Sequence, residues 1–280
     1  MLKQRVITAL VLLAILLPAL FAAQPQWFMA VALVLITLAA WEWGQLNGYT
    51  KKSSWLIALD CLVLCALAWK FDLPYRSLPM LWVVAGGAWV LLGAWLLRRG
   101  VAGWAAIHRW IRTIGGVLLL ALAWLAVARA RVMGINVLLS ILVLVWGADV
   151  FAYFAGRRFG RRKLAPSISP GKSWEGVWGG MVGVLMISMV WIYLDQAGIG
   201  IAQSSLYTRL AAQGWWLLVL AVLFMCAMSV VGDLVESLVK RSAGAKDSSQ
   251  LLPGHGGVLD RVDALLPTMP LAVMLMALLA

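Results

Sequence analysis

Long runs of apolar residues, separated by short polar segments, fill the sequence from end to end. A helix that crosses a bilayer needs about 20 consecutive, largely apolar residues. Runs of about this length fall at nine places: 6–23, 27–46, 54–69, 78–97, 115–133, 135–156, 177–195, 214–239 and 264–280. The pattern therefore predicts an all-α fold, a polytopic helical bundle with about nine transmembrane helices.

The basic residues predict how these spans are oriented. If the spans alternate in direction, 18 of the 23 Lys and Arg residues fall on one side of the membrane, and the other side receives Lys70, Arg76, Arg129, Arg131 and Arg209. Cytoplasmic loops of membrane proteins carry an excess of Lys and Arg. We therefore expect the N-terminus in the cytoplasm and the C-terminus outside.

Composition excludes an ordinary soluble domain. Apolar residues make up 64% of the 280 positions and charged residues 12%, whereas soluble domains contain roughly 25% charged residues. A net charge of +12 would suggest nucleic acid in a soluble protein, but no nucleic-acid-binding motif is found. The expected partners are anionic membrane lipids and phosphate-bearing substrates.

An ionisable residue within a span is costly and commonly functional. Asp149 follows an apolar run and shares one helical face with Tyr153 and Arg157. Two interpretations remain open: an Asp–Arg pair that stabilises a helix end, or a site for a cation or substrate near the cytoplasmic boundary.

The basic segment 160–176 follows this face. Gly171-Lys172-Ser173 resembles the end of a phosphate-binding P-loop, but Pro166 stands where that motif needs glycine, and we expect no strand before it. A P-loop is therefore rejected. Basic and hydroxyl-bearing residues beside turn-forming Pro and Gly still favour a segment that binds polyphosphate. The candidates are Ser169, Lys172, Ser173 and Glu175.

The eighth predicted span ends in a polar stripe. Its members lie on one face of an otherwise apolar helix, at positions i, i+3, i+4, i+7 and i+8: Asp233, Glu236, Ser237, Lys240 and Arg241. Exposure of such a stripe to lipid would be too costly. It must line a cavity or contact a partner.

A second polar segment, 246–263, follows. Asp260 and Asp263 are three residues apart and can share a helical face, with Lys246 and Arg261 nearby. Carboxylates bind Mg²⁺ and cations neutralise phosphate, so this pattern is typical of a metal–phosphate site. Gly256 and Gly257 would let backbone N–H groups approach an anion closely. His255 and Asp247 are further candidates, although a lone histidine is more often structural.

These residues form a recognisable pattern. It reads Ser237-x-Val239-Lys240-Arg241, four residues, Lys246-Asp247-x-Ser249, two residues, Leu252-Pro253-x-His255-Gly256-Gly257-Val258-x-Asp260-Arg261-Val262-Asp263. It resembles the signature of the phosphatidate cytidylyltransferases, also called CDP-diacylglycerol synthases. The stretch from Asp149 to Gly176 is similar to a second family segment, with Gly171 standing where a polar or basic residue is expected. The resemblance covers roughly the C-terminal half.

The resemblance implies that CTP and phosphatidic acid react to give CDP-diacylglycerol and pyrophosphate, with Mg²⁺ and with a second, monovalent cation left open. It implies a homodimer in the bacterial inner membrane, with the active site facing the cytoplasm. Residues 1–134 would then form supporting and dimerising helices, and residues 135–280 the catalytic region of a single membrane domain.

Residue chemistry and the resemblance together give three sets of candidate site residues. The metal ligands are Asp233, Asp260 and Asp263. The catalytic set adds Lys240, Arg241, Lys246, Asp247, His255 and Arg261. The substrate-binding set is Asp149, Tyr153, Arg157, Ser169, Lys172, Ser173, Glu175, Ser237, Gly256 and Gly257.

Two other functions remain as alternatives. A CTP-dependent polyprenol or lipid kinase would use similar polar loops but would transfer the γ-phosphate. A membrane transporter would also carry charged residues within spans, but commonly shows discontinuous helices in paired halves. No such repeat is visible here.

Overall fold

The structure is a computed structural model that describes the backbone of residues 2–279 and the side chains of residues 4–279. Within these residues, nine helical segments are long and apolar enough to cross a membrane. They are α1 (Leu2–Phe21), α2 (Pro25–Leu46), α3 (Lys51–Lys70), α4 (Pro79–Ala105), α5 (Arg109–Met133), α6 (Ile135–Phe159), α7 (Trp174–Gln196), α9 (Trp215–Ser242), and α10 (Leu259–Val262) with α11 (Leu265–Leu278). The prediction of an all-α membrane bundle with about nine spans is confirmed; its final residue, Ala280, lies outside the described residues.

Several helices extend beyond the predicted apolar runs, because polar residues continue their last turns. Helix α6 reaches Phe159, and α9 reaches Ser242. Three short elements were not predicted: the 3₁₀ helix η1 (Leu73–Tyr75), α8 (Leu206–Gln213), and a hairpin of β1 (Lys163–Ala165) and β2 (Ser169–Ser173). The expectation that no strand precedes Gly171-Lys172-Ser173 was wrong, since β1 comes before these residues and β2 contains them.

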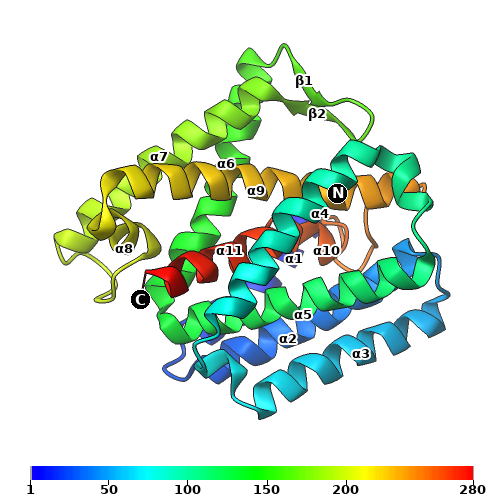
Figure 1. The fold of residues 1–280 in the computed structure, drawn as a ribbon, viewed down its shortest axis with the longest axis horizontal. Helices are drawn as coiled ribbons and strands as arrows, with labels where there is room; N and C mark the ends of the chain where they lie inside the picture. Colours follow the sequence, from blue (N-terminus) through cyan, green and yellow to red (C-terminus); the bar gives the residue numbers. More distant parts are fainter. Residues whose placement is uncertain (1, 280) are drawn as a thin grey trace.

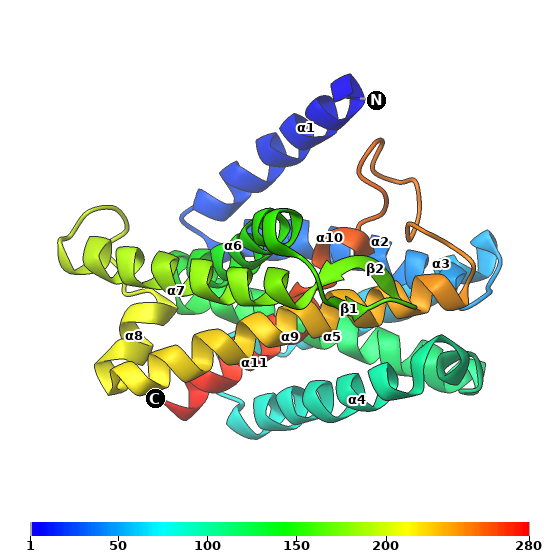
Figure 2. The same ribbon diagram turned by 90° about the horizontal axis from the view of Figure 1, so that it is seen from above.

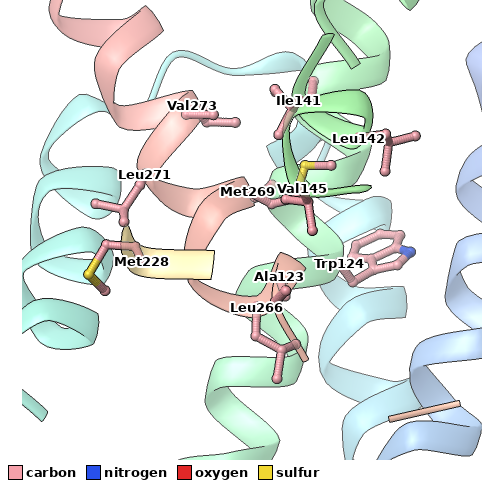
Figure 3. Packing of buried hydrophobic residues seen from close by; sticks show 14 of the residues in the cluster. Ala123, Trp124, Ile141, Leu142, Val145, Met228, Leu266, Met269, Leu271 and Val273 are labelled. Carbon is pink, nitrogen blue, oxygen red and sulfur yellow. The ribbon is translucent and has the colours of Figure 1, made fainter. Parts of the chain in front are cut away.

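Helix α11 lies at the centre of the bundle (Figure 1) and packs against α4, α5, α6 and α9. Inside the protein, 61% of the last span is buried, compared with 6% of α1. A helix that is apolar on all sides is suited to such a central position. Figure 3 shows Leu266, Met269, Leu271 and Val273 of α11 among buried side chains of α5, α6 and α9.

Helix α1 leans away from the other helices (Figure 2) and packs mainly on α2. Its C-terminal end is held by the buried Arg131 of α5. This guanidinium donates hydrogen bonds to the carbonyl oxygens of Leu20 (3.1 Å) and Ala22 (2.5 Å). Near its other end, the Thr8 hydroxyl donates to the carbonyl of Pro253 (2.9 Å). Helix α1 therefore touches the polar loop that precedes α10.

Helices α6 and α7 approach each other closely through glycines. A Cβ atom added at Gly176 or Gly180 would lie 2.9 Å from the carbonyl oxygen of Ala152 or Ala148, respectively. Small residues spaced four apart allow membrane helices to pack with their backbones in contact. This packing places the polar face of α6 beside the hairpin that precedes α7.

The end of α7 remote from the hairpin is fastened by Asp195. Its carboxylate accepts hydrogen bonds from Asn136 Nδ2 of α6 (2.9 Å), from the backbone N–H of Ser205 (3.0 Å) and from the Thr208 hydroxyl of α8 (2.5 Å). Charge-assisted bonds of this kind hold α6, α7 and α8 together at that end.

Candidate active site

A polar cavity of about 460 Å³ lies between α6, β2, α7 and α9. Residues Asp149, Tyr153 and Arg157 of α6 all line it, as the predicted shared face requires. Arg157 Nη1 donates to the Tyr153 hydroxyl (3.1 Å). No ion pair between Arg157 and Asp149 is found among the described residues, so the geometry favours the cavity interpretation over the helix-end pair.

Lys172 and Asp233 connect the hairpin with α9. Lys172 Nζ lies 2.5 Å from Asp233 Oδ2, and both side chains are about three-quarters buried, with 24% and 27% exposed. Asp233 Oδ1 also accepts a hydrogen bond from the Ser237 hydroxyl (3.2 Å). A second link joins Arg241 Nε to the carbonyl of Ile168 (3.3 Å). The basic segment 160–176 therefore contacts the polar stripe of α9.

Of three further predicted substrate-binding residues, Ser169 and Ser173 line this cavity and Glu175 does not. Ser169 lines it from β2. Ser173 is the N-cap of α7, where its hydroxyl accepts the N–H of Gly176 (3.2 Å). Glu175 accepts the backbone N–H groups of Arg161 (3.1 Å) and Arg162 (3.2 Å). Ser173 and Glu175 thus fix the hairpin relative to α7.

A buried ion-pair cluster, consisting of Glu236, Lys240 and Asp260, lies further along α9. Lys240 Nζ is 2.5 Å from Glu236 Oε2 and 2.6 Å from Asp260 Oδ1. The exposed fractions of these side chains are 3% for Glu236, 12% for Lys240 and 8% for Asp260. Charges this deeply buried persist only when paired, so the three residues form one electrostatic unit.

The second oxygen of Asp260 organises the loop before α10. Asp260 Oδ2 accepts the N–H of Ser248 (2.9 Å), the Ser248 hydroxyl (2.9 Å) and the N–H of Gly257 (2.8 Å). A Cβ atom at Gly256 would lie 2.7 Å from the same oxygen, and Gly256 has a φ of +78°. The two predicted glycines therefore allow the backbone to fold around a carboxylate of the protein itself.

Asp263 lies beside the Asp233 region of α9. A Cβ atom at Gly232 would come within 2.5 Å of the carbonyl oxygen of Asp263. Asp263 Oδ1 accepts the N–H of Ala264 (2.7 Å). The Asp263 carboxylate experiences the negative charges of Asp233 and Asp149 and the positive charge of Lys240. Asp263 therefore lies next to the turn of α9 that carries Asp233.

The donor set fits a Mg²⁺ ion in its chemistry. Across residues 4–279, no three His, Cys, Asp or Glu side chains come together as a group that could hold a metal ion, so the three predicted ligands Asp233, Asp260 and Asp263 do not form one set around a common point. Mg²⁺ is usually bound through one or two carboxylates, several waters and substrate phosphates rather than by an all-protein cage. Ammonium groups bonded to Asp233 and Asp260 mark positions where positive charge is stabilised.

The remaining predicted residues do not line the polar cavity. Arg261 is exposed and donates from both Nε (3.0 Å) and Nη2 to the carbonyl of His255. The His255 Nδ1 atom is buried and has no hydrogen-bond partner among residues 4–279. Lys246 and Asp247 lie on the exposed loop, and neither side chain has a hydrogen bond or ion pair within the described part of the chain. The structure does not bring these last two residues into the cavity.

Sequence reasoning missed Glu42. This residue of α2 is fully buried and contacts the loop that carries the signature. A signal was present, because Glu42 is a single acidic residue within a predicted span, and the criterion that singled out Asp149 applies equally to it.

Carboxylates, lysines and arginines around a cavity in a polytopic bundle define a class of protein: an integral membrane enzyme that acts on phosphates. Residues 3–279 match the family described as the cytidylyltransferase family. This chain is 38% identical over 274 residues to the phosphatidate cytidylyltransferase of Pseudomonas aeruginosa, covering 96% of this chain and 95% of the relative. For the phosphatidate cytidylyltransferase of Haemophilus influenzae the identity is 36% over 290 residues, 96% of each chain.

A shorter match, 39% over 145 residues, relates 52% of this chain to 49% of the Bacillus subtilis phosphatidate cytidylyltransferase. The chain belongs to the cytidylyltransferase family and is a membrane nucleotidyltransferase. The resemblance inferred from the signature is thereby confirmed.

Proposed function

We propose that this protein is a phosphatidate cytidylyltransferase that converts CTP and phosphatidic acid into CDP-diacylglycerol and pyrophosphate. One structural observation supports the proposal in addition to family membership. Lys172, in one segment that resembles this family, contacts Asp233, one helical turn before the other segment begins at Ser237, and both residues line a cavity of about 460 Å³. A nucleotide phosphate chain can therefore be surrounded by residues of both segments.

In this reaction a phosphate oxygen of phosphatidate attacks the α-phosphorus of CTP. A new P–O bond forms, the bond from the α-phosphorus to the bridging oxygen breaks, and pyrophosphate leaves with that electron pair. A phosphate monoester has its second pKa near 6, so the nucleophile is already anionic and no strong general base is needed. The barrier is largely the repulsion between anions.

Cationic side chains address this repulsion. Lys172 and Arg157 line the polar cavity and would neutralise nucleotide phosphates. Lys240, held between Glu236 and Asp260, would attract a second phosphate close by. Preorganised charges of this kind stabilise the charge that develops in a transition state without reorganising during the reaction.

We also propose Mg²⁺ as the cofactor, bound by one or two of the predicted ligands Asp233, Asp260 and Asp263 together with water and substrate phosphate. When bound, the ion would neutralise phosphate charge and orient the reacting oxygens. Mutual repulsion among neighbouring carboxylates supports this assignment, because a cation relieves it. A second, monovalent cation would be accommodated by Asp149, which lines the same cavity.

The lipid chains require an apolar environment. An apolar cavity of about 270 Å³ lies between α4, α5 and α9, on the side of α9 that carries Glu236, and is lined by Trp89, Trp104 and Leu259 among others. Gly232 contributes to this cavity and is followed directly by Asp233 in the polar one. We propose that an acyl chain of phosphatidate lies here while its phosphate approaches the carboxylate–lysine region.

Location and assembly follow from the same proposal. The predicted cytoplasmic face carries 18 of 23 Lys and Arg residues, and the candidate site contains several of them, including Lys172 and Lys240. We therefore place the active site at the cytoplasmic face of a bacterial inner membrane, and we propose a homodimer. Mass measurement of the intact protein in nanodiscs would test the oligomeric state.

Purified protein incubated with CTP, phosphatidic acid and Mg²⁺ tests the function. The expected products are CDP-diacylglycerol and pyrophosphate in equal amounts, and chelation of the metal should abolish both. Diacylglycerol in place of phosphatidic acid serves as the control and should give no product. Formation of CDP with a phosphorylated lipid would instead establish the kinase alternative and overturn the proposal.

A further inference from the structure

We propose that Glu42 is a positioning residue for the nucleotidyl transfer: from α2, its buried carboxylate holds the loop of residues 248–259 so that Asp260 faces Lys240. The kinetic test of this inference rests on the proposed function, because it measures kcat/KM for the formation of CDP-diacylglycerol. It assigns a role to a helix in the N-terminal half of the chain, outside the segments that resemble the family signature.

The hydrogen bonds to Glu42 come from one loop only. Its Oε1 atom accepts the Ser249 hydroxyl (2.6 Å) and the backbone N–H of Val258 (2.9 Å). Its Oε2 atom accepts the Ser248 hydroxyl (3.0 Å) and the N–H of Leu259 (2.7 Å). Within the described residues, every hydrogen bond to this carboxylate comes from the segment 248–259, which ends at the first residue of α10. The contacts therefore fix the loop, rather than the packing of α2 against its neighbours.

Burial makes these bonds costly to lose. Glu42 is 0% exposed, and hydrogen bonds that involve a charged group are worth more than neutral ones. Removal of the carboxylate would leave two backbone N–H groups and the Ser249 hydroxyl without their acceptor, while the Ser248 hydroxyl could still donate to Asp260 Oδ2. The loop would then have to move to regain partners, because an unsatisfied buried donor is rarely tolerated.

The contact leaves no space beside it. A Cβ atom at Gly257 would lie 2.0 Å from Ser248 Oγ and 2.5 Å from Glu42 Oε1. Glycine is required at this position because the loop passes directly over the carboxylate. This close approach explains one of the glycines of the signature without any contact to substrate.

The path from Glu42 to the reacting region is short. The Ser248 hydroxyl lies between Glu42 Oε2 (3.0 Å) and Asp260 Oδ2 (2.9 Å). Leu259, whose N–H binds Glu42, is the first residue of α10 and directly precedes Asp260. Asp260 in turn binds Lys240. A shift of the loop would therefore displace both the carboxylate and the cation of the buried cluster.

The variant Glu42→Gln tests this role. Gln has the same shape as Glu. Its amide nitrogen, however, is a donor and would replace a carboxylate oxygen that accepts two hydrogen bonds from the loop. Replacing residues that orient catalytic or metal-binding groups typically costs about 10- to 100-fold, and we expect a fall of this size in kcat/KM.

The matched control is Asp195→Asn. Asp195 accepts a comparable set of hydrogen bonds from Asn136, Ser205 and Thr208, but at the remote end of α7. We expect it to lower the thermal unfolding temperature as Glu42→Gln does and to leave kcat/KM within about twofold of wild type.

A double-mutant cycle separates positioning from stability alone. Ser249→Ala removes one donor to Glu42 and should lower kcat/KM by itself. In the Glu42→Gln background the same change should have little further effect, because coupled residues act non-additively. If the two substitutions lower kcat/KM independently and are coupled only in their effect on the unfolding temperature, Glu42 stabilises the fold and does not position Asp260.

The outcomes are distinguishable. Wild-type protein that forms no CDP-diacylglycerol counts against the proposed function. Active wild type together with a Glu42→Gln enzyme of unchanged kcat/KM overturns the positioning role alone, as does an equal loss in Asp195→Asn. If Glu42→Gln does not fold, Ser249→Ala decides: a reduced kcat/KM supports the role, and a wild-type value overturns it.

Discussion

Lys172 of the hairpin and Asp233 of α9 form a 2.5 Å ion pair across the wall of the polar cavity. The pair joins two segments that are remote in the sequence. It also leaves an ammonium group where nucleotide phosphates are proposed to bind. When substrate enters, Lys172 can exchange its bond to Asp233 for a bond to phosphate, and Asp233 then becomes available to a cation.

We predict that Lys172→Gln lowers kcat/KM by about 10²- to 10³-fold, the usual cost of removing one preorganised electrostatic contact. Initial rates of CDP-diacylglycerol formation would measure this loss. Lys163→Gln is the matched control, because Lys163 lies on the other strand of the hairpin and is exposed. Equal activity of the two variants would remove Lys172 from the mechanism.

Asp260→Asn should reduce turnover by at least about 10²-fold. The change removes charge rather than volume, and both Asp260 oxygens are engaged, one by Lys240 and the other by Ser248 and Gly257. The protein should still elute from size-exclusion chromatography in detergent as a single species. Asp72→Asn provides the control, since Asp72 is exposed and has a φ of +56° that asparagine tolerates. Near-normal turnover of Asp260→Asn would exclude a catalytic role.

Lys240→Met should destabilise the protein by about 3–5 kcal/mol, because it leaves buried carboxylates without their cation. The measurement is the thermal unfolding temperature in detergent. Adding Glu236→Gln should restore much of the stability by removing one unpaired charge, while activity stays low. Lys70→Met, at an exposed helix end, should leave the unfolding temperature unchanged. A stable Lys240→Met variant would contradict the buried ion-pair cluster.

Gly257→Ala should impair both stability and activity, because the added methyl group would overlap Ser248 Oγ and Glu42 Oε1. Overpacking of this kind typically costs about 1–3 kcal/mol. Gly87→Ala in α4 is the comparison, since no atom lies within 4 Å of an added Cβ there. We expect Gly87→Ala to match wild type in unfolding temperature and product formation. If both alanine variants behave alike, the loop does not pass as closely over Glu42 as described.

Local properties of the sequence predicted much of this fold. Hydropathy within about 20 residues identifies a span, so the number of spans and the polar stripe from Asp233 to Arg241 could be recognised. The hairpin around Lys172 escaped this method, because its strands are short and lack apolar alternation. Helix ends such as Phe159 were also placed too early, since polar residues continue a helix beyond its apolar run.

The site was predicted less completely, because its contacts join residues remote in the sequence. Glu42 reaches Ser248 and Leu259 across more than 200 intervening positions, and spacing within one segment cannot reveal such a contact. Composition likewise did not distinguish Asp260, which is enclosed by its own loop, from Lys246 and Asp247, which remain exposed.

Helix α9 carries one wall of the polar cavity and the lysine of the buried cluster on a single uninterrupted element, from Asp233 to Lys240. An α-helix rises about 1.5 Å per residue, so seven residues separate these positions by about 10 Å along the axis. Insertions or deletions in the loops joining the other helices leave that interval unchanged. The spacing between the cavity wall at Asp233 and the buried cluster at Lys240 is therefore set by the rise of one helix, whatever the lengths of the loops around it.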